Sequence, residues 1–349
     1  MEKSEIFGLL EKLCPPAGVS GDEEDAAQAA CAVLSQYGDA AFDKYTGNVI
    51  FRRSGWDESK PNVLLDAHID EIGLIVTDVT AEGFLKVAAC GGVDARVLAA
   101  QQVEILGTAS GRKQRLTGFV ATIAPHLQRD YSKALKVEQV LIDTGFTSKE
   151  KVLKLIALGD RVYIPNTPAV LLDGRVTSKA LDDRAGCAAL IAAVSMLQGQ
   201  QLGCNVTITL TSQEEVGERG AKMAAYIAAA DAAIEVDVSF ADTPDESPED
   251  CAKLGSGVMI GASPSLSRRM TRQMKAIAGE LGIPYTIEVM GETTGTNADV
   301  IGVSEGGIPA VTLSIPIRYM HTPAEVAALE DIKNTALLIS EYLKREYQV

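Results

Sequence analysis

The spacing of hydrophobic and polar positions changes twice along the chain and divides it into three parts. After Ser178, helical spacing alternates with short strand-like runs, which favours a mainly parallel sheet covered by helices. The elements predicted there are strands at 205–211, 233–239 and 310–315, and helices at 184–198, 220–230, 265–281 and from Ala324. Near the N-terminus, Ser20-Gly21-Asp22-Glu23 has the form of a capping box, which predicts a helix ending near Gln36.

The middle part, from Glu71 to about Tyr163, has a different texture. Short alternating runs such as L-I-V-T-D-V and Q-V-E-I-L-G-T recur with glycines between them, and one segment, T-S-K-E-K-V-L-K-L-I, favours a helix. This pattern is typical of a small all-β module, such as a barrel. The sequence therefore predicts an α/β domain formed by residues 1–70 and 164–349, interrupted by a β insert at residues 71–163.

Composition narrows the class of protein. A chain of 349 residues is too long for one ordinary core, and its net charge of −15 disfavours nucleic acid and anionic membrane surfaces. No apolar run approaches the roughly 18 residues of a membrane-spanning helix, and the first residues lack the apolar core of a signal peptide. The 6 cysteines include no C-x-x-C pair, which favours free thiols in a reducing compartment. We expect a cytoplasmic protein that binds neither nucleic acid nor membrane.

The most informative segment is T-S-Q-E-E-V-G-E-R-G-A, in which Glu214 and Glu215 come just after the predicted strand at 205–211. Carboxylates at the end of a buried strand are costly to desolvate unless a cation or hydrogen-bond donors compensate them. Ligands of α/β sheets also bind outside the carboxyl ends of the strands. An isolated acidic pair is more often a solvated turn, so the interpretation depends on other segments.

Three further segments carry the same kind of chemistry. In D-A-H-I-D-E, the side chains of His68 and Asp70 share one face of a strand. A carboxylate there can accept a hydrogen bond from one ring nitrogen while the other nitrogen faces a metal ion. The pair Asp182-Asp183 precedes a predicted helix, where either could simply cap it, and Asp237 lies toward the far end of the predicted strand at 233–239.

The last segment, I-R-Y-M-H-T-P-A-E, places His321 just before Thr322 and Pro323, which could cap and begin the C-terminal helix. Taken singly, each candidate has an ordinary explanation as a cap, a turn residue or a core histidine. Together they supply two imidazoles and three carboxylates: His68, Asp182, Glu215, Asp237 and His321. Two cations about 3.5–4 Å apart need a bridging carboxylate and terminal nitrogen and oxygen ligands, and this set has that chemistry. The sequence contains no G-x-S-x-G and no Walker A motif.

In this order along the chain, A-H-I-D-E, A-L-D-D-R-A-G, E-E-V-G-E-R-G-A, the Asp237 strand and R-Y-M-H-T-P resemble the M42 family of dinuclear metallo-aminopeptidases. The resemblance runs from C-P-P-A-G-V-S-G to the C-terminus. It implies a phosphopeptidase/hydrolase-like mixed α/β sheet flanked by helices, with an inserted small β-barrel domain that mediates oligomer contacts. It also implies a tetrahedral homododecamer that removes N-terminal residues from short peptides.

The resemblance also implies roles for individual residues. His68, Asp182 and Asp237 would hold one divalent ion, and Asp182, Glu215 and His321 would hold the other, so that Asp182 bridges them. Glu214 would be the general base, and Asp70 would orient His68. Zinc is the expected metal, with cobalt or manganese as alternatives, because nitrogen and oxygen ligands select weakly among these ions.

Two other functions stay open at this point. A related co-catalytic metallohydrolase, such as a deacylase or a carboxypeptidase, would share the ligands but prefer other substrates. A non-enzymatic metal-binding scaffold would require an impaired site. In addition, many M42 relatives have G-T-D-A where this chain has G-T-N-A. Asn297 therefore removes a charge near the expected substrate pocket and leaves the preferred N-terminal residue open.

Overall fold

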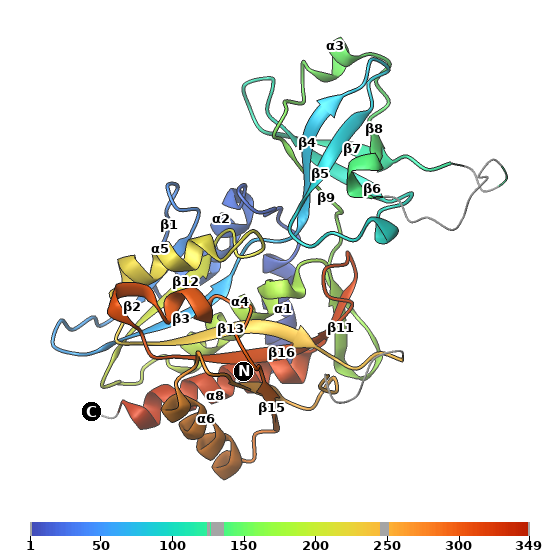
Figure 1. The fold of residues 1–349 in the computed structure, drawn as a ribbon. Helices are drawn as coiled ribbons and strands as arrows, with labels where there is room; N and C mark the ends of the chain where they lie inside the picture. Colours follow the sequence, from blue (N-terminus) through green and yellow to red (C-terminus); the bar gives the residue numbers. More distant parts are fainter. Residues whose placement is uncertain (1, 124–125, 127–135, 245–250, 348–349) are drawn as a thin grey trace. The chain divides into compact units, whose positions relative to one another are not determined.

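The computed structural model describes residues 2–123, 126, 136–244 and 251–347 (Figure 1). Contacts within the chain divide it into two units. The first unit consists of Met1–Asp70, Thr167–Met320 and Ala324–Val349, and the second consists of Glu71–Asn166 and His321–Pro323. Among the helices of the described residues, none is both long enough and apolar enough to span a membrane.

The first unit is built on a mixed sheet of 11 strands, in which β12, β3, β13 and β16 lie side by side and parallel. In spatial order the main path of the sheet is β1 (Gly38–Phe42), β2 (Val49–Arg53), β12 (Asn205–Thr211), β3 (Asn62–His68), β13 (Ala232–Phe240), β16 (Ala310–Arg318), β17 (Glu325–Ala328), β11 (Arg175–Ser178) and β10 (Ala169–Val170). Strand β14 (Val258–Ala262) pairs with β16 and with β15 (Tyr285–Val289). The predicted strand at 205–211 coincides with β12.

Helices cover both faces of this sheet, and its central strands are therefore buried on both sides. The helices of the first unit are α1 (Lys3–Leu13), α2 (Glu24–Leu34), α4 (Leu181–Met196), α5 (Arg219–Ala228), α6 (Arg268–Leu281), α7 (Ala298–Ile301) and α8 (Leu329–Glu346). Val63 and Leu65 of β3 pack in one cluster with α4 and α8, whereas Leu64 packs in another with α5. Helices α5 and α8 accordingly lie on opposite sides of the sheet (Figure 1). The alanine-rich α4 is buried on every side from Leu181 to Val194.

The second unit is a closed antiparallel barrel with the strand order β4-β5-β8-β7-β6-β9. Its strands are β4 (Gly73–Val79), β5 (Leu85–Cys90), β6 (Gln102–Gly107), β7 (Gln114–Val120), β8 (Leu141–Asp143) and β9 (Arg161–Tyr163). Branched aliphatic residues such as Leu74, Val87 and Ile142 fill its interior. The predicted fold class, a mixed α/β sheet flanked by helices with an inserted β-barrel, is confirmed.

Two local predictions are wrong, and a third holds for only part of its length. The helix expected from Ala324 begins only at Leu329, because residues 325–328 form β17 and pair with β11 and β16. Ser20 does not cap a helix, because its hydroxyl donates a hydrogen bond to Asp70, 50 residues away. The segment T-S-K-E-K-V-L-K-L-I contains only the short helix α3 (Lys149–Val152). In the first two cases a long-range partner overrides a local signal.

Candidate metal centre

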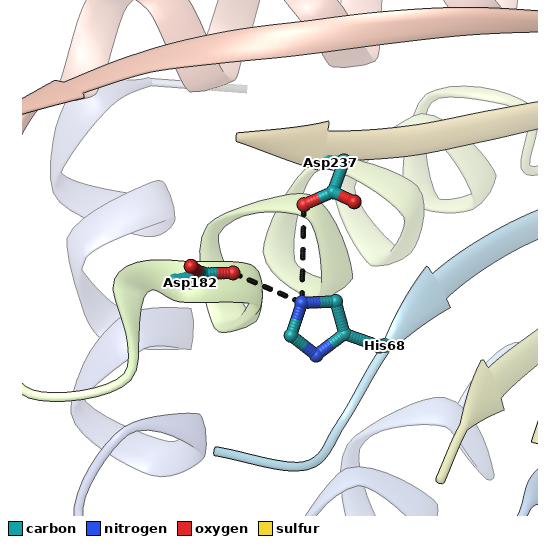
Figure 2. Close-up of side chains that lie close together, drawn as sticks. All are labelled: His68, Asp182 and Asp237. Atoms are coloured by element: carbon teal, nitrogen blue, oxygen red, sulfur yellow. Dashed lines mark hydrogen bonds and ion pairs between the residues drawn. The ribbon is translucent and has the colours of Figure 1, made fainter. Parts of the chain in front are cut away.

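His68, Asp182 and Asp237 point toward one another at the carboxyl end of the central strands (Figure 2). His68 Nε2 lies 2.9 Å from Asp182 Oδ1 and 3.8 Å from Asp237 Oδ1. All three side chains are buried, and one possible ligand atom from each lies within 4.8 Å of the others. Strand register explains this convergence, because Glu235 of β13 pairs with Asp66 of β3 and so brings Asp237 beside His68.

Asp182 and Asp183 have different surroundings, although they are neighbours at the start of α4. Asp182 faces His68, and its backbone amide donates a hydrogen bond to Glu325 Oε2 at 3.1 Å. Asp183 instead accepts a hydrogen bond from the amide of Gly186 at 2.9 Å, as a helix-capping residue does. The sequence left open which aspartate caps the helix; the geometry gives that role to Asp183 and leaves Asp182 for a ligand.

Asp70 connects His68 to the segment that carries Glu214 and Glu215. Its buried carboxylate accepts hydrogen bonds from Ser20 Oγ at 2.6 Å and from the amides of Glu214 and Glu215 at 3.0 and 3.3 Å. Asp70 Oδ1 also lies 3.5 Å from His68 Nδ1. The backbone oxygen of Asp70 lies closer to this nitrogen, at 3.2 Å, so Asp70 contacts the imidazole through its main chain as well as its carboxylate, and the carboxylate also holds the backbone of the acidic pair that follows β12.

The two glutamates of that pair have separate places. A Glu215 carboxylate oxygen lies within 4.8 Å of Asp182, so these two could share a cation. Burial raises the pKa of Glu214 to about 7; the charge of His68 lowers this pKa, and the charges of Glu215 and Asp70 raise it. A carboxyl that titrates near neutral pH suits a general base.

The charges of the centre fit a bound divalent cation. Burial raises the pKa of Asp237 well above its usual range, and the neighbouring Asp182 and Glu214 add to this rise. Burial alone would lower the pKa of His68, yet hydrogen bonds to Asp182 and Asp70 raise it well above its usual range. The buried carboxylates of Asp70, Asp182 and Asp237 around one imidazole thus leave an excess of negative charge, which a cation would neutralise. Imidazole and carboxylate donors suit zinc and similar ions.

His321 lies in the three-residue segment 321–323, which groups with the second unit. It directly follows Met320 of the first unit, and its backbone is left-handed, with φ of 61°. Its role as a metal ligand stays a prediction.

Two residues of the site were not predicted as such from the sequence. Ser20 and Glu325 contact the predicted residues Asp70 and Asp182, respectively. Both lie in segments that resemble capping boxes, so a local signal masked their long-range partners. Their common feature, visible only in the structure, is that each holds a proposed site residue by a hydrogen bond.

Comparison with known proteins identifies the family. The family model described as M42 glutamyl aminopeptidase matches residues 47–338. The chain belongs to this family. As an M42 member it is an aminopeptidase, a hydrolase of peptide bonds, in a family of metallopeptidases. A lysyl aminopeptidase of Pyrococcus furiosus is 30% identical over 344 residues, which cover 96% of each chain.

Solved M42-like structures agree along nearly the whole chain. An aminopeptidase of the archaeon Desulfurococcus kamchatkensis matches with a TM-score of 0.90 and 31% identity, covering 99% of this chain and 96% of its own. The TET1 peptidase of Pyrococcus horikoshii, which can assemble into a tetrahedron or a large octahedral shell, matches with a TM-score of 0.85 and 30% identity. That match covers 99% of this chain and 100% of the TET1 chain.

Asn297 of this M42 chain lies inside the protein and is only 1% exposed. Its amide donates hydrogen bonds to Asp66 Oδ2 at 2.8 Å and to Thr211 Oγ1 at 2.7 Å. Asp66 is fully buried and also accepts a hydrogen bond from Thr209. Burial raises the pKa of Asp66 to about 7, and the hydrogen bonds from Thr209 and Asn297 lower it. The neutral amide of Asn297 therefore stabilises a buried carboxylate.

We expect Asn297→Asp to lower the free energy of unfolding by about 3 kcal/mol at pH 8, the low end for leaving a buried charge uncompensated. The new carboxyl would lie beside Asp66, so its folded-state pKa would be raised. A carboxyl group whose pKa is higher in the folded than in the unfolded state destabilises the protein increasingly as pH rises above the unfolded-state pKa. The loss of unfolding free energy should therefore be smaller at pH 5 than at pH 8. Urea denaturation in chelator at both pH values measures it.

The charge-swapped variant Asp66→Asn/Asn297→Asp is the matched control for that prediction. It restores one carboxylate and one amide donor at the same two positions, so most of the lost stability should return. Equal unfolding free energies for the wild type and Asn297→Asp at pH 8 would show that the amide of Asn297 does not stabilise the carboxylate of Asp66.

Proposed function

We propose that this M42 aminopeptidase uses two divalent ions to hydrolyse the first peptide bond of short peptides with a free N-terminus. The observation that carries the proposal is the convergence of His68, Asp182 and Asp237, together with the approach of Glu215 to Asp182. His68, Asp182 and Asp237 would hold one ion. Asp182, Glu215 and His321 would hold the other, with Asp182 as the bridge.

When bound, the ions supply Lewis acidity that polarises the peptide carbonyl and lowers the pKa of water. The chain's own residues manage the protons. Glu214 accepts a proton from the attacking water on its carboxylate and then donates it to the leaving amine. Asp70 keeps the imidazole of His68 in place through Nδ1 and fixes the Glu214 amide, so that base and ligands keep a constant geometry.

Zinc is the proposed native metal, because the proposed ligands are imidazole nitrogens and carboxylate oxygens. Cobalt or manganese would bind the same donors, so metal supply also contributes to the choice.

Matched peptides with a free or an acetylated N-terminus test the proposed reaction. We expect the metal-loaded protein to release the N-terminal residue only from the free peptide. A deacylase would instead release acetate from the acetylated peptide, and a carboxypeptidase would shorten both from the C-terminus. Absence of turnover across a broad panel, with two ions bound, would favour a non-enzymatic scaffold.

We also propose that the insert at residues 71–163 mediates assembly of a homododecamer, with residues 1–70 and 164–349 as the catalytic domain. A related TET1 peptidase is a dodecamer in its crystal, which supports this proposal. Closed symmetry is the usual outcome for subunits that join through repeated contacts. Analytical ultracentrifugation at micromolar concentration should give a large single species. A monomer would reject the proposed assembly and leave the proposed peptide hydrolysis unaffected.

A further inference from the structure

Gly92, in the second unit, lies directly against the imidazole of His321. A Cβ atom added to Gly92 would overlap Nδ1 of that ring and lie 2.9 Å from Cε1. Real Cβ atoms essentially never approach another atom this closely, and the three nearest atoms all belong to His321. The ring therefore occupies the space that a side chain at position 92 would need.

Backbone conformation does not explain this glycine. The preceding Gly91 has a φ of 77°, in the left-handed region that favours glycine, whereas Gly92 is not among the positive-φ residues. An alanine could adopt the Gly92 backbone without strain of that kind. What position 92 lacks is room, and the atoms that take up the room are those of His321.

His321 itself is held in an unfavourable backbone conformation. Its φ of 61° is left-handed, and so is the φ of Tyr319, also 61°. For residues with a side chain, this conformation is unfavourable and persists only where the surroundings enforce it. Gly91 and Gly92 are part of those surroundings. Because the backbone of His321 is constrained, its ring has little freedom to move away from a new methyl group at position 92.

We propose that Gly92 is a positioning residue for the second metal ion, acting through the ring of His321. This inference rests on the proposed function, in which His321 is a ligand of that ion. A side chain at position 92 would displace the imidazole, and displaced ligands lose affinity steeply, because metal coordination tolerates only small errors in geometry.

Gly92→Ala should weaken binding of one of two ions by roughly 10–100-fold, the range for losing a residue that orients a ligand. The other ion should bind as in the wild type, because its proposed ligands lie in the first unit. Calorimetric titration of metal-free protein with zinc, together with elemental analysis, gives the number of ions and both affinities without reference to activity.

Gly118→Ala is the matched control within the same unit. A Cβ atom at Gly118 would lie 2.9 Å from side-chain atoms of Ile105 and Ile142, inside the barrel and among residues that do not include His321. The two alanines therefore introduce similar crowding at different places. Gly118→Ala should cost stability and keep both ions at wild-type affinity.

The outcomes separate the inference from the proposed function. A wild type that binds fewer than two ions would reject the two-ion function. A wild type with two ions and a Gly92→Ala protein with the same two affinities would overturn the role of Gly92. Equal loss of the second ion in Gly118→Ala would also overturn it, because general damage to the barrel would then be the cause.

A second variant keeps the inference testable if Gly92→Ala does not fold. Gly92→Ala/His321→Ala removes the ring that the methyl group meets, so folding should recover while only one ion binds tightly. A double variant that also fails to fold would show that the crowding at position 92 does not come from His321, and the inference would be overturned.

Discussion

Replacing Glu214 with glutamine is expected to reduce kcat at least about 100-fold while both metal ions stay bound. Glutamine has nearly the shape of glutamate, so the site should keep its packing, and the backbone amide at 214 can still donate to Asp70. The amide cannot accept a proton at neutral pH, and the general base is lost. Steady-state kinetics and elemental analysis on the same preparation measure both parts of the prediction.

The pH profile gives a second measure of the same role. Burial raises the pKa of Glu214 to about 7, and bound cations would lower it. A base must be deprotonated to act, so wild-type kcat/KM should fall as pH decreases through a value at or below about 7. Glu214→Gln should lose this acidic limb along with most of its rate.

Glu215→Gln is the control for Glu214→Gln, since the two residues are neighbours of identical chemistry. As a proposed ligand, Glu215 should affect metal content as well as rate when it is changed. If Glu214→Gln lost metal and Glu215→Gln kept it, the two roles would be reversed.

Asp182→Asn is expected to bring activity to background and to reduce metal content below one ion per subunit. Asp182 is the proposed bridge between the ions, and it is the residue that approaches both His68 and Glu215. An amide offers a single neutral oxygen, which cannot neutralise two cations or coordinate both. Elemental analysis after gel filtration, with peptide hydrolysis measured alongside, tests this prediction.

Asp183→Asn provides the adjacent control. Asp183 accepts a hydrogen bond from the Gly186 amide, and asparagine caps helices about as well as aspartate does. Two bound ions and near wild-type activity are therefore expected. Retention of both ions by Asp182→Asn, or their loss from Asp183→Asn, would reject the assignment of the bridge.

The strands that position the site could be predicted from the sequence because they are buried on both faces. Residues 205–211 carry apolar or β-branched side chains at nearly every position, and all are buried in β12. The place of the acidic pair after this strand indicates a ligand site, since α/β proteins bind ligands at the carboxyl ends of strands, and the other acidic and histidine segments support that interpretation. His68 and Asp237 follow the same rule.

Contacts between distant segments could not be predicted in this way. Ser20 and Asp70 are 50 residues apart, and Asp66 and Asn297 are 231 apart, so no local pattern relates them. Asn297, which the sequence places near the expected substrate pocket, is buried and donates a hydrogen bond to Asp66. The amide of Asn297 donates a hydrogen bond to the buried carboxylate of Asp66, and the sequence alone does not relate the two positions.

The end of the chain shows the same limit. Thr322, Pro323 and Glu325 satisfy the rules for a capped helix, yet Glu325 begins a strand. Pairing of β17 with β11 and β16 outweighs the local helical signal. It also brings the Glu325 carboxylate to the amide of Asp182. The predicted helix did not suggest this contact.

Metal titration of the chelated protein tests the two-ion aminopeptidase most directly. Protein freed of metal by exhaustive chelation receives zinc in steps, and bound zinc and the release of N-terminal residues from a free peptide are measured at each step. We expect background activity in the metal-free protein and full recovery as bound zinc reaches two ions per subunit. Full activity in protein that elemental analysis shows to be free of metal would contradict this mechanism.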